Sequence, residues 1–129
     1  MATVTSSAAS AFVDALVARD FARAAAQLHP EVDFRAMTPR RIWDPEGPAG
    51  VEEVLRTWFE DPAEEIEWVE ATVPVSIANT VRVGWLVRLH DADGPRMFEQ
   101  QAYVRERDGR IGWMRVVCSG YRPAPSAGS

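Results

Sequence analysis

The charged residue best placed for chemistry is Asp44, in the Pro- and Gly-rich segment MTPRRIWDPEGPAG. A carboxylate beside a pocket can act as a general base when a substrate proton lies within hydrogen-bond reach. The same DPEG tetrapeptide is typical of an Asx-type turn, which is the alternative interpretation. Arg40 and Arg41 could hold an anion at the rim of such a pocket or form a solvated pair. Asp44 is therefore the candidate catalytic group.

The two histidines and the single cysteine predict neither a metal site nor a nucleophile. His29 and His90 have no second His or Cys at ligand spacing. Cys118 lies in an apolar segment, where a thiol stays protonated and inert. The chain also contains no Gly-rich phosphate loop and no G-x-S-x-G elbow. No metal or cofactor is expected, and the lone cysteine excludes an internal disulfide.

Two kinds of periodicity divide the chain. Apolar spacing predicts helices at 7–19, 21–28 and 51–60, with Asp20 as the N-cap of the second, and a short strand at 32–36. From Ile66 onward the period becomes two, which predicts strands at 66–77, 81–90, 97–107 and 110–121. Asp-Gly turns join the later strands as hairpins. Helices followed by an antiparallel sheet indicate an α+β fold.

Length and charge limit the classes of function. A chain of 129 residues suits a single domain at 1–129, with a core at about 7–122 and a flexible tail at 123–129. The net charge of −5 makes nucleic acid an unfavourable partner. No apolar run approaches the roughly 20 residues of a membrane span. The first residues lack the basic and apolar pattern of a secretory signal, so we expect a cytoplasmic protein.

Three segments resemble the nuclear transport factor 2-like superfamily, and within it the SnoaL-like and ketosteroid-isomerase-like proteins. They are FVDALVARDFARAAAQLHPEVDFRA, GPAGVEEVLRTWF and VRERDGRIGWMRVV. The resemblance implies a cone-shaped, cystatin-like roll, in which N-terminal helices pack against a curved, mainly antiparallel sheet. In ketosteroid isomerase a carboxylate base moves the proton, while a Tyr and a protonated Asp stabilise the oxyanion. The matching positions here are Ala36, Phe12 and Ala102, so the resemblance implies that fold without its acid-base residues.

Strand alternation and the resemblance together predict an apolar pocket inside the cone. Its expected ligand-binding residues are Phe12, Leu16, Ala36, Trp43, Trp58, Trp85, Phe98, Gln100, Ala102, Met114, Val116 and Cys118. Such a lining suits a small, apolar, cyclic ligand held by one or two hydrogen bonds. A filled core is the alternative.

The leading hypothesis is therefore a SnoaL-like protein that binds a small apolar molecule. One alternative is an enzyme of the polyketide-cyclase-like or isomerase-like type that uses loop groups such as Asp44. The other is a non-catalytic dimerisation or partner-binding module. Open space inside the cone, with a carboxylate at its mouth, would favour the enzyme, whereas a sealed core would favour the partner module.

The opposite face of the sheet mixes charges with aromatic residues. It is predicted to carry Arg88, Glu99, Gln101, Tyr103, Trp113, Arg115 and Val117. Aromatic residues with Arg are typical of protein interfaces. Because members of the superfamily commonly dimerise through this face, we expect a homodimer that uses Tyr103, Trp113 and Arg115. A solvated face with extended arginines is the alternative.

Overall fold

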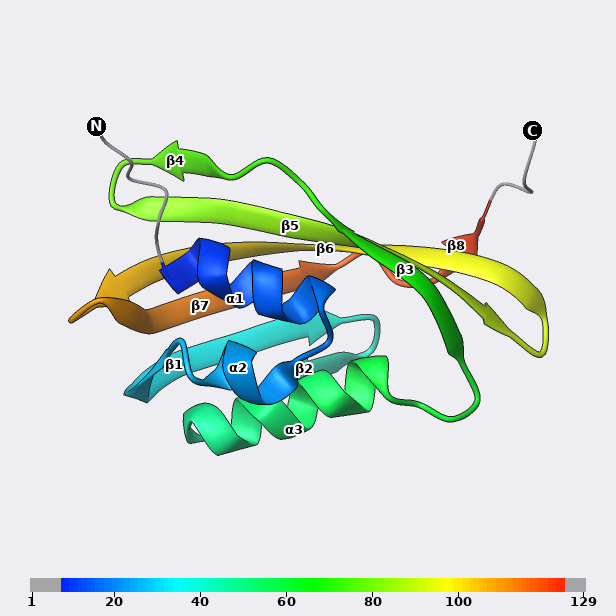
Figure 1. The fold of residues 1–129 in the computed structure, drawn as a ribbon, viewed down its shortest axis with the longest axis horizontal. Helices are drawn as coiled ribbons and strands as arrows, with labels where there is room; N and C mark the ends of the chain where they lie inside the picture. Colours follow the sequence, from blue (N-terminus) through cyan, green and yellow to red (C-terminus); the bar gives the residue numbers. More distant parts are fainter. Residues whose placement is uncertain (1–7, 125–129) are drawn as a thin grey trace.

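The computed structural model describes residues 8–124, in which helices cover one side of a long, bent sheet (Figure 1). The helices are α1 (Ala8–Val17), α2 (Phe21–Ala25) and α3 (Gly47–Phe59). The strands are β1 (Leu28–Thr38), β2 (Arg41–Trp43), β3 (Glu65–Ala71), β4 (Val75–Ile77), β5 (Thr80–Asp91), β6 (Gly94–Arg107), β7 (Arg110–Cys118) and β8 (Arg122–Pro123). The predicted α+β architecture is confirmed.

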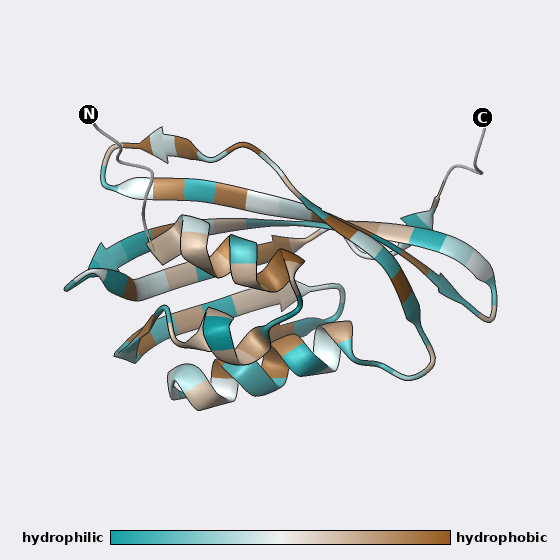
Figure 2. Cartoon of the chain, viewed as in Figure 1, coloured by the Kyte–Doolittle hydropathy of each residue, from teal (hydrophilic) through white to brown (hydrophobic). Residues whose placement is uncertain are grey.

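The strands form one sheet in the order β2-β1-β7-β6-β5-β3, with β4 on β5 and β8 on β6. All pairs are antiparallel except β1 and β7, which run parallel. Hydrophobic and hydrophilic residues alternate along β5 (Figure 2), as expected when one face of a strand is buried and the other is not. The inward positions of β5, β6 and β7 therefore line the concave side that the helices cover.

Local residues set the start of α2 and the irregular beginning of β1. Asp20 caps α2 as predicted, because its Oδ1 accepts from the backbone N–H of Arg23 at 3.1 Å. The helix stops at Ala25, however, and the chain is already a strand at Leu28. Pro30 lies inside β1, where the register with β7 shifts between Leu28 and Asp33. A proline has no N–H to give to a strand ladder, so this interruption falls where β1 is least able to pair.

Three further elements differ from the prediction. The strand expected at 66–77 is divided into β3 and β4, with Pro74 in the break. The segment expected to be a loop contains β2, which pairs with β1. Arg122–Pro123 forms β8 on β6, so the chain stays in the sheet beyond the point where the tail was expected to begin. Ser7 and residues 125–129 lie outside the described residues.

The core lies between α1 and the concave side of the sheet. Phe12 and Leu16 of α1 are fully buried, as is Trp85 of β5. The rings of Phe12 and Trp85 lie 6.4 Å apart, which places α1 directly against the sheet. Among residues 8–124, no helix combines the length and the apolar character that crossing a membrane requires.

Candidate ligand-binding site

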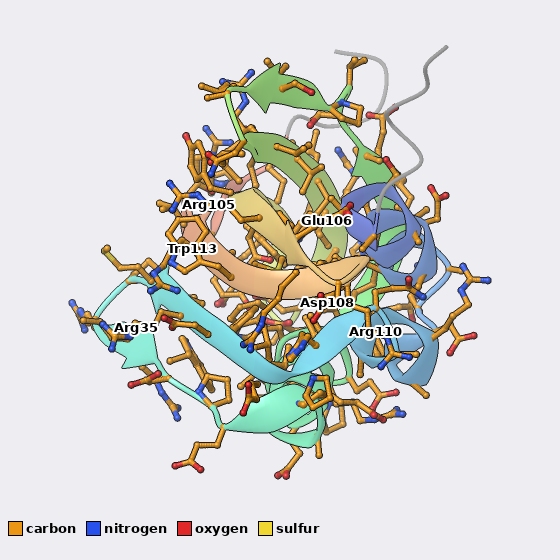
Figure 3. The ribbon with its side chains drawn as sticks, turned by 90° about the vertical axis from the view of Figure 1, so that its left-hand side faces the viewer. Arg35, Arg105, Glu106, Asp108, Arg110 and Trp113 are labelled. Carbon is orange, nitrogen blue, oxygen red and sulfur yellow. The ribbon has the colours of Figure 1, made fainter. Side chains whose placement is uncertain are left out.

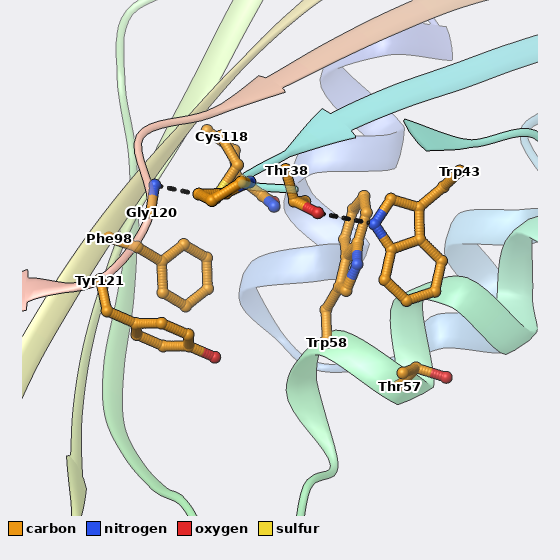
Figure 4. Close-up of a pocket in the computed structure, with 10 residues that line it drawn as sticks. Thr38, Trp43, Thr57, Trp58, Phe98, Cys118, Gly120 and Tyr121 are labelled. Carbon is orange, nitrogen blue, oxygen red and sulfur yellow. Dashed lines mark hydrogen bonds between the residues drawn. The ribbon is translucent and has the colours of Figure 1, made fainter. Parts of the chain in front are cut away.

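A pocket of about 330 Å³ lies at one end of the cone, which we call the mouth (Figure 4). The mouth pocket is lined by Thr38, Pro39, Trp43, Thr57, Trp58, Phe98, Gln100, Cys118, Gly120 and Tyr121. None of these ten side chains carries a full charge at neutral pH. The pocket is therefore an uncharged site with several aromatic walls.

Two edge-to-face aromatic pairs form opposite walls of the mouth pocket (Figure 4). The rings of Trp43 and Trp58 lie 5.8 Å apart at 87°. Those of Phe98 and Tyr121 lie 5.5 Å apart at 78°. Such pairs contribute about 0.5–1.5 kcal/mol beyond the area that they bury, so they hold the walls in place.

Four different segments bring these residues together. Trp58 comes from the last turn of α3, and Trp43 ends β2. Phe98 and Gln100 are two apart on β6, so both point to the concave side. Tyr121 follows Gly120, which has a φ of +80°. A Cβ on Gly120 would lie 2.8 Å from Cγ of Pro39, so the chain can turn this closely only at a glycine.

Most polar groups of the mouth pocket already have partners. Trp43 Nε1 donates to Thr38 Oγ1 at 2.8 Å, and Thr57 Oγ1 donates to the Glu53 carbonyl at 2.9 Å. Trp58 Nε1 differs from them, because it is buried and finds no acceptor among the described residues. A buried donor without a partner costs about 1–3 kcal/mol.

The structure brings five of the predicted ligand-binding residues to the mouth pocket: Trp43, Trp58, Phe98, Gln100 and Cys118. The other seven are packed in the core and at most 2% exposed: Phe12, Leu16, Ala36, Trp85, Ala102, Met114 and Val116. We call this packed region the sealed end. Phe12 of α1 packs against Trp85 of β5 there, so side chains occupy the space between that helix and the sheet.

The positions matched to the acid-base residues of ketosteroid isomerase all lie in the sealed end. Phe12, Ala36 and Ala102 are buried and carry no titratable group. Asp44 does not replace them, because it is exposed and its Oδ1 lies 3.6 Å from Nε of Arg35. It is absent from the residues that line the mouth pocket. The structure therefore does not bring Asp44 to this site.

A pair of titratable groups at the mouth was not predicted from the sequence. The Tyr121 hydroxyl is hydrogen-bonded to the Glu64 side chain. Burial raises the pKa of the Glu64 carboxyl, the hydrogen bond from Tyr121 lowers it, and the Asp61 charge raises it. Burial and Glu64 together raise the pKa of Tyr121, which stays a neutral phenol. An aromatic residue directly after a glycine at a strand end was the available signal for Tyr121.

Among residues 8–124, no cluster of three or more His, Cys, Asp or Glu side chains is arranged to hold a metal ion. Cys118 Sγ instead accepts from the Gly120 backbone N–H at 3.4 Å. The thiol therefore helps to fix the turn that carries Tyr121.

Solved structures with the same fold are numerous, although no protein-family model and no curated protein matches the chain. One is a hypothetical protein with a ketosteroid isomerase-like fold from Catenulispora acidiphila, solved in complex with trimethylamine. It is 12% identical, with a TM-score of 0.67, and the match covers 88% of this chain and 85% of that one.

Two other solved structures are also similar to the chain. A nuclear transport factor 2-like protein of unknown function from Cytophaga hutchinsonii is 13% identical, with a TM-score of 0.64 over 86% of this chain and 96% of that one. An epoxide hydrolase from M. tuberculosis is 19% identical, with a TM-score of 0.61 over 87% and 80%. At such low identity these likenesses establish the fold alone: the chain has the nuclear transport factor 2-like, ketosteroid isomerase-like cone fold.

Proposed function

We propose that the protein binds a small, uncharged, ring-containing molecule in the mouth pocket. The observation that carries the proposal is the pocket itself. Its volume is about 330 Å³, and two aromatic pairs form its opposite walls. Gln100 is the one buried polar side chain among the described residues, and it lines this pocket. Apolar walls with a few placed polar groups are typical of small-molecule sites of this size.

The walls favour a ring over a chain. Flat ligands can stack on, or meet edge to face with, the Trp58 and Phe98 rings. The lining residues include no cation that would pair with an anionic ligand. Trp58 Nε1 and the Gln100 amide nitrogen are N–H donors, which pair with an acceptor atom on an uncharged ligand. An uncharged ring compound fits all of these features together.

Catalysis has weaker support from the geometry. The exposed Asp44 carboxylate faces Arg35 outside the mouth pocket, so it is not in position to take a proton from a bound ligand. The Glu64 carboxyl at the mouth is engaged by the Tyr121 hydroxyl and is not among the residues that line the pocket. We therefore propose binding as the function and assign no reaction.

The test uses the indole N–H signals of the five tryptophans in a ¹H–¹⁵N spectrum, assigned from Trp→Phe variants. Ethylbenzene and acetophenone should shift the Trp43 and Trp58 signals saturably. The Trp113 signal, from the opposite face of the sheet, should not move and serves as an internal control. Tetramethylammonium chloride should shift none of them. Saturable shifts with the ammonium alone, or with no probe at all, would refute the proposal.

A second proposal is a homodimer formed through the outer face of the sheet, with Tyr103, Trp113 and Arg115. The supporting observation is that two guanidinium groups lie over the Trp113 ring. The Arg105 group lies 4.5 Å and the Arg115 group 4.7 Å from the ring centroid, and Figure 3 shows Arg105 beside Trp113. These contacts hold a large aromatic side chain in one orientation on an outward surface. A preorganised Trp beside Arg is typical of interface anchors.

Light scattering tests the dimer. We expect twice the monomer mass of 14.3 kDa at micromolar concentration. Trp113→Gln should shift the protein towards monomer without loss of secondary structure. Val73→Gln, which changes an exposed apolar residue between β3 and β4, is the control and should leave the mass unchanged. A wild-type protein that scatters as a monomer at all concentrations would exclude the dimer.

A further inference from the structure

A hydrogen bond between Trp85 and Gln100 fixes the only buried amide side chain among the described residues. The two residues face each other directly across β5 and β6. Trp85 is fully buried and Gln100 is 1% exposed. Trp85 Nε1 donates to Gln100 Oε1 at 2.7 Å.

This bond allows the Gln100 amide only one orientation. An indole N–H can donate but cannot accept, so it must be paired with the amide oxygen and not with the amide nitrogen. If the amide turned over, two N–H groups would face each other and a buried indole N–H would lose its partner. Leaving a buried donor without a partner lowers the stability of the folded state. The oxygen of Gln100 is therefore held towards Trp85.

The amide nitrogen of Gln100 is left available to donate a hydrogen bond to a ligand in the mouth pocket. Gln100 lines that pocket, and the hydrogen bond that the structure gives for its side chain uses Oε1, so Nε2 is not engaged by it. Trp58 Nε1 is a second donor without an acceptor. The hydroxyl protons of Thr57 and Tyr121 are already given to the Glu53 carbonyl and to Glu64. The side-chain N–H groups of Gln100 and Trp58 are therefore available to a ligand, beside the hydroxyl oxygens of the two threonines and of Tyr121.

We propose that the Trp85–Gln100 hydrogen bond makes the mouth pocket selective for uncharged ring compounds that present an acceptor oxygen, such as a carbonyl or ether, to Gln100 Nε2. This inference rests on the proposed function and specifies its ligand class. Trp85 acts as a positioning residue, because it sets the direction of the amide from outside the pocket. A ligand whose only polar group is a donor would meet a like group and bind poorly.

The test compares acetophenone with ethylbenzene, which have nearly the same shape and differ in a carbonyl. Their affinities are measured by NMR titration in the wild type, in Gln100→Leu and in Gln101→Leu. Gln101 is the matched control, because it lies on the outer face and its amide donates to Glu99. In Gln100→Leu the affinity for acetophenone should fall about tenfold relative to that for ethylbenzene, as expected for one lost hydrogen bond in a buried site.

The control should keep the wild-type ratio. If both probes bind and Gln100→Leu leaves their ratio unchanged, the donor assignment is wrong while the proposed function stands. If neither probe binds, the proposed function fails and this inference fails with it.

The positioning role of Trp85 has its own readout. Acetophenone, but not ethylbenzene, should shift the Gln100 side-chain amide signals, which are identified among three glutamines by their loss in Gln100→Leu. In Trp85→Phe the amide is free to turn, so the acetophenone preference should fall several-fold although Gln100 is present. A folded Trp85→Phe protein with an unchanged preference would refute the positioning role. Should that variant not fold, the Gln100→Leu comparison still decides the donor assignment.

Discussion

The sealed end and the mouth are built from the same strands, yet one is packed and the other is open. At the sealed end, Phe12 and Leu16 of α1 lie against Trp85, and all three are fully buried. At the mouth, Trp58 and Phe98 stand on opposite walls of a pocket. The inward residues of β6 contribute to both regions, with Ala102 at one end and Phe98 at the other.

The difference teaches that strand alternation and pocket formation are separate matters. Alternation decides which side chains point to the concave face of the sheet. Whether that space is filled depends on the helix that covers it. α1 packs at the sealed end, whereas the mouth is bordered by the end of α3 and the turn at Gly120 (Figure 4).

The largest expected effect tests whether the sealed end is truly packed. Leu16→Ala should lower the free energy of unfolding by about 2–5 kcal/mol, because it removes buried methyl groups and leaves a cavity. Urea denaturation measures the change. Thr57→Ala at the mouth is the contrasting variant and should cost under about 1 kcal/mol. A small loss for Leu16→Ala would mean that the sealed end is loose.

A smaller effect tests where a ligand lies. Ala102→Leu adds volume to the sealed end and should cost about 1–3 kcal/mol through overpacking. Acetophenone should bind the folded variant as it binds the wild type, because Ala102 does not line the mouth pocket. Thermal melts and NMR titration measure the two effects. Lost binding with unchanged stability would place the ligand deep in the cone and break the distinction between the two ends.

The smallest effect concerns titration, because the mouth contains a half-buried acidic group and the sealed end has none among its residues. Burial raises the pKa of Glu64, so the folded state keeps this proton to higher pH than the unfolded chain does. Ionised Glu64 therefore opposes folding above its folded pKa, and the opposition vanishes below the unfolded value. Glu64→Gln should be the more stable protein at pH 7 by less than about 1 kcal/mol, since the group is partly screened by solvent.

The stability difference between wild type and Glu64→Gln should shrink from pH 7 to pH 4. Urea midpoints at the two pH values measure it. A variant that is less stable than the wild type at pH 7 would show that the hydrogen bond from Tyr121 outweighs burial.

The sequence predicted the architecture better than the site. Period-two alternation correctly assigned Phe98 and Gln100 to the concave side, and Asp20 correctly marked the start of α2. The alternation could not show that Phe12 of α1 packs against Trp85, because that depends on the distance between elements far apart in the chain. The contact between Tyr121 and Glu64 could not be predicted from the sequence for a related reason. They meet only because the turn at Gly120 comes close to the segment between α3 and β3.

The parallel pairing of β1 with β7 governs the order in which the fold can form. Asp33 and Arg115, which touch across this pair, are 82 residues apart in sequence. During synthesis β1 therefore leaves the ribosome long before its partner and must wait unpaired along most of its length. Long-range pairing of this kind slows folding and exposes strand edges to other chains. Pro30 and the charged side chains of Asp33 and Arg35 reduce the risk that the unpaired β1 associates with a strand of another chain. Proline and charged side chains both oppose edge-to-edge pairing of strands.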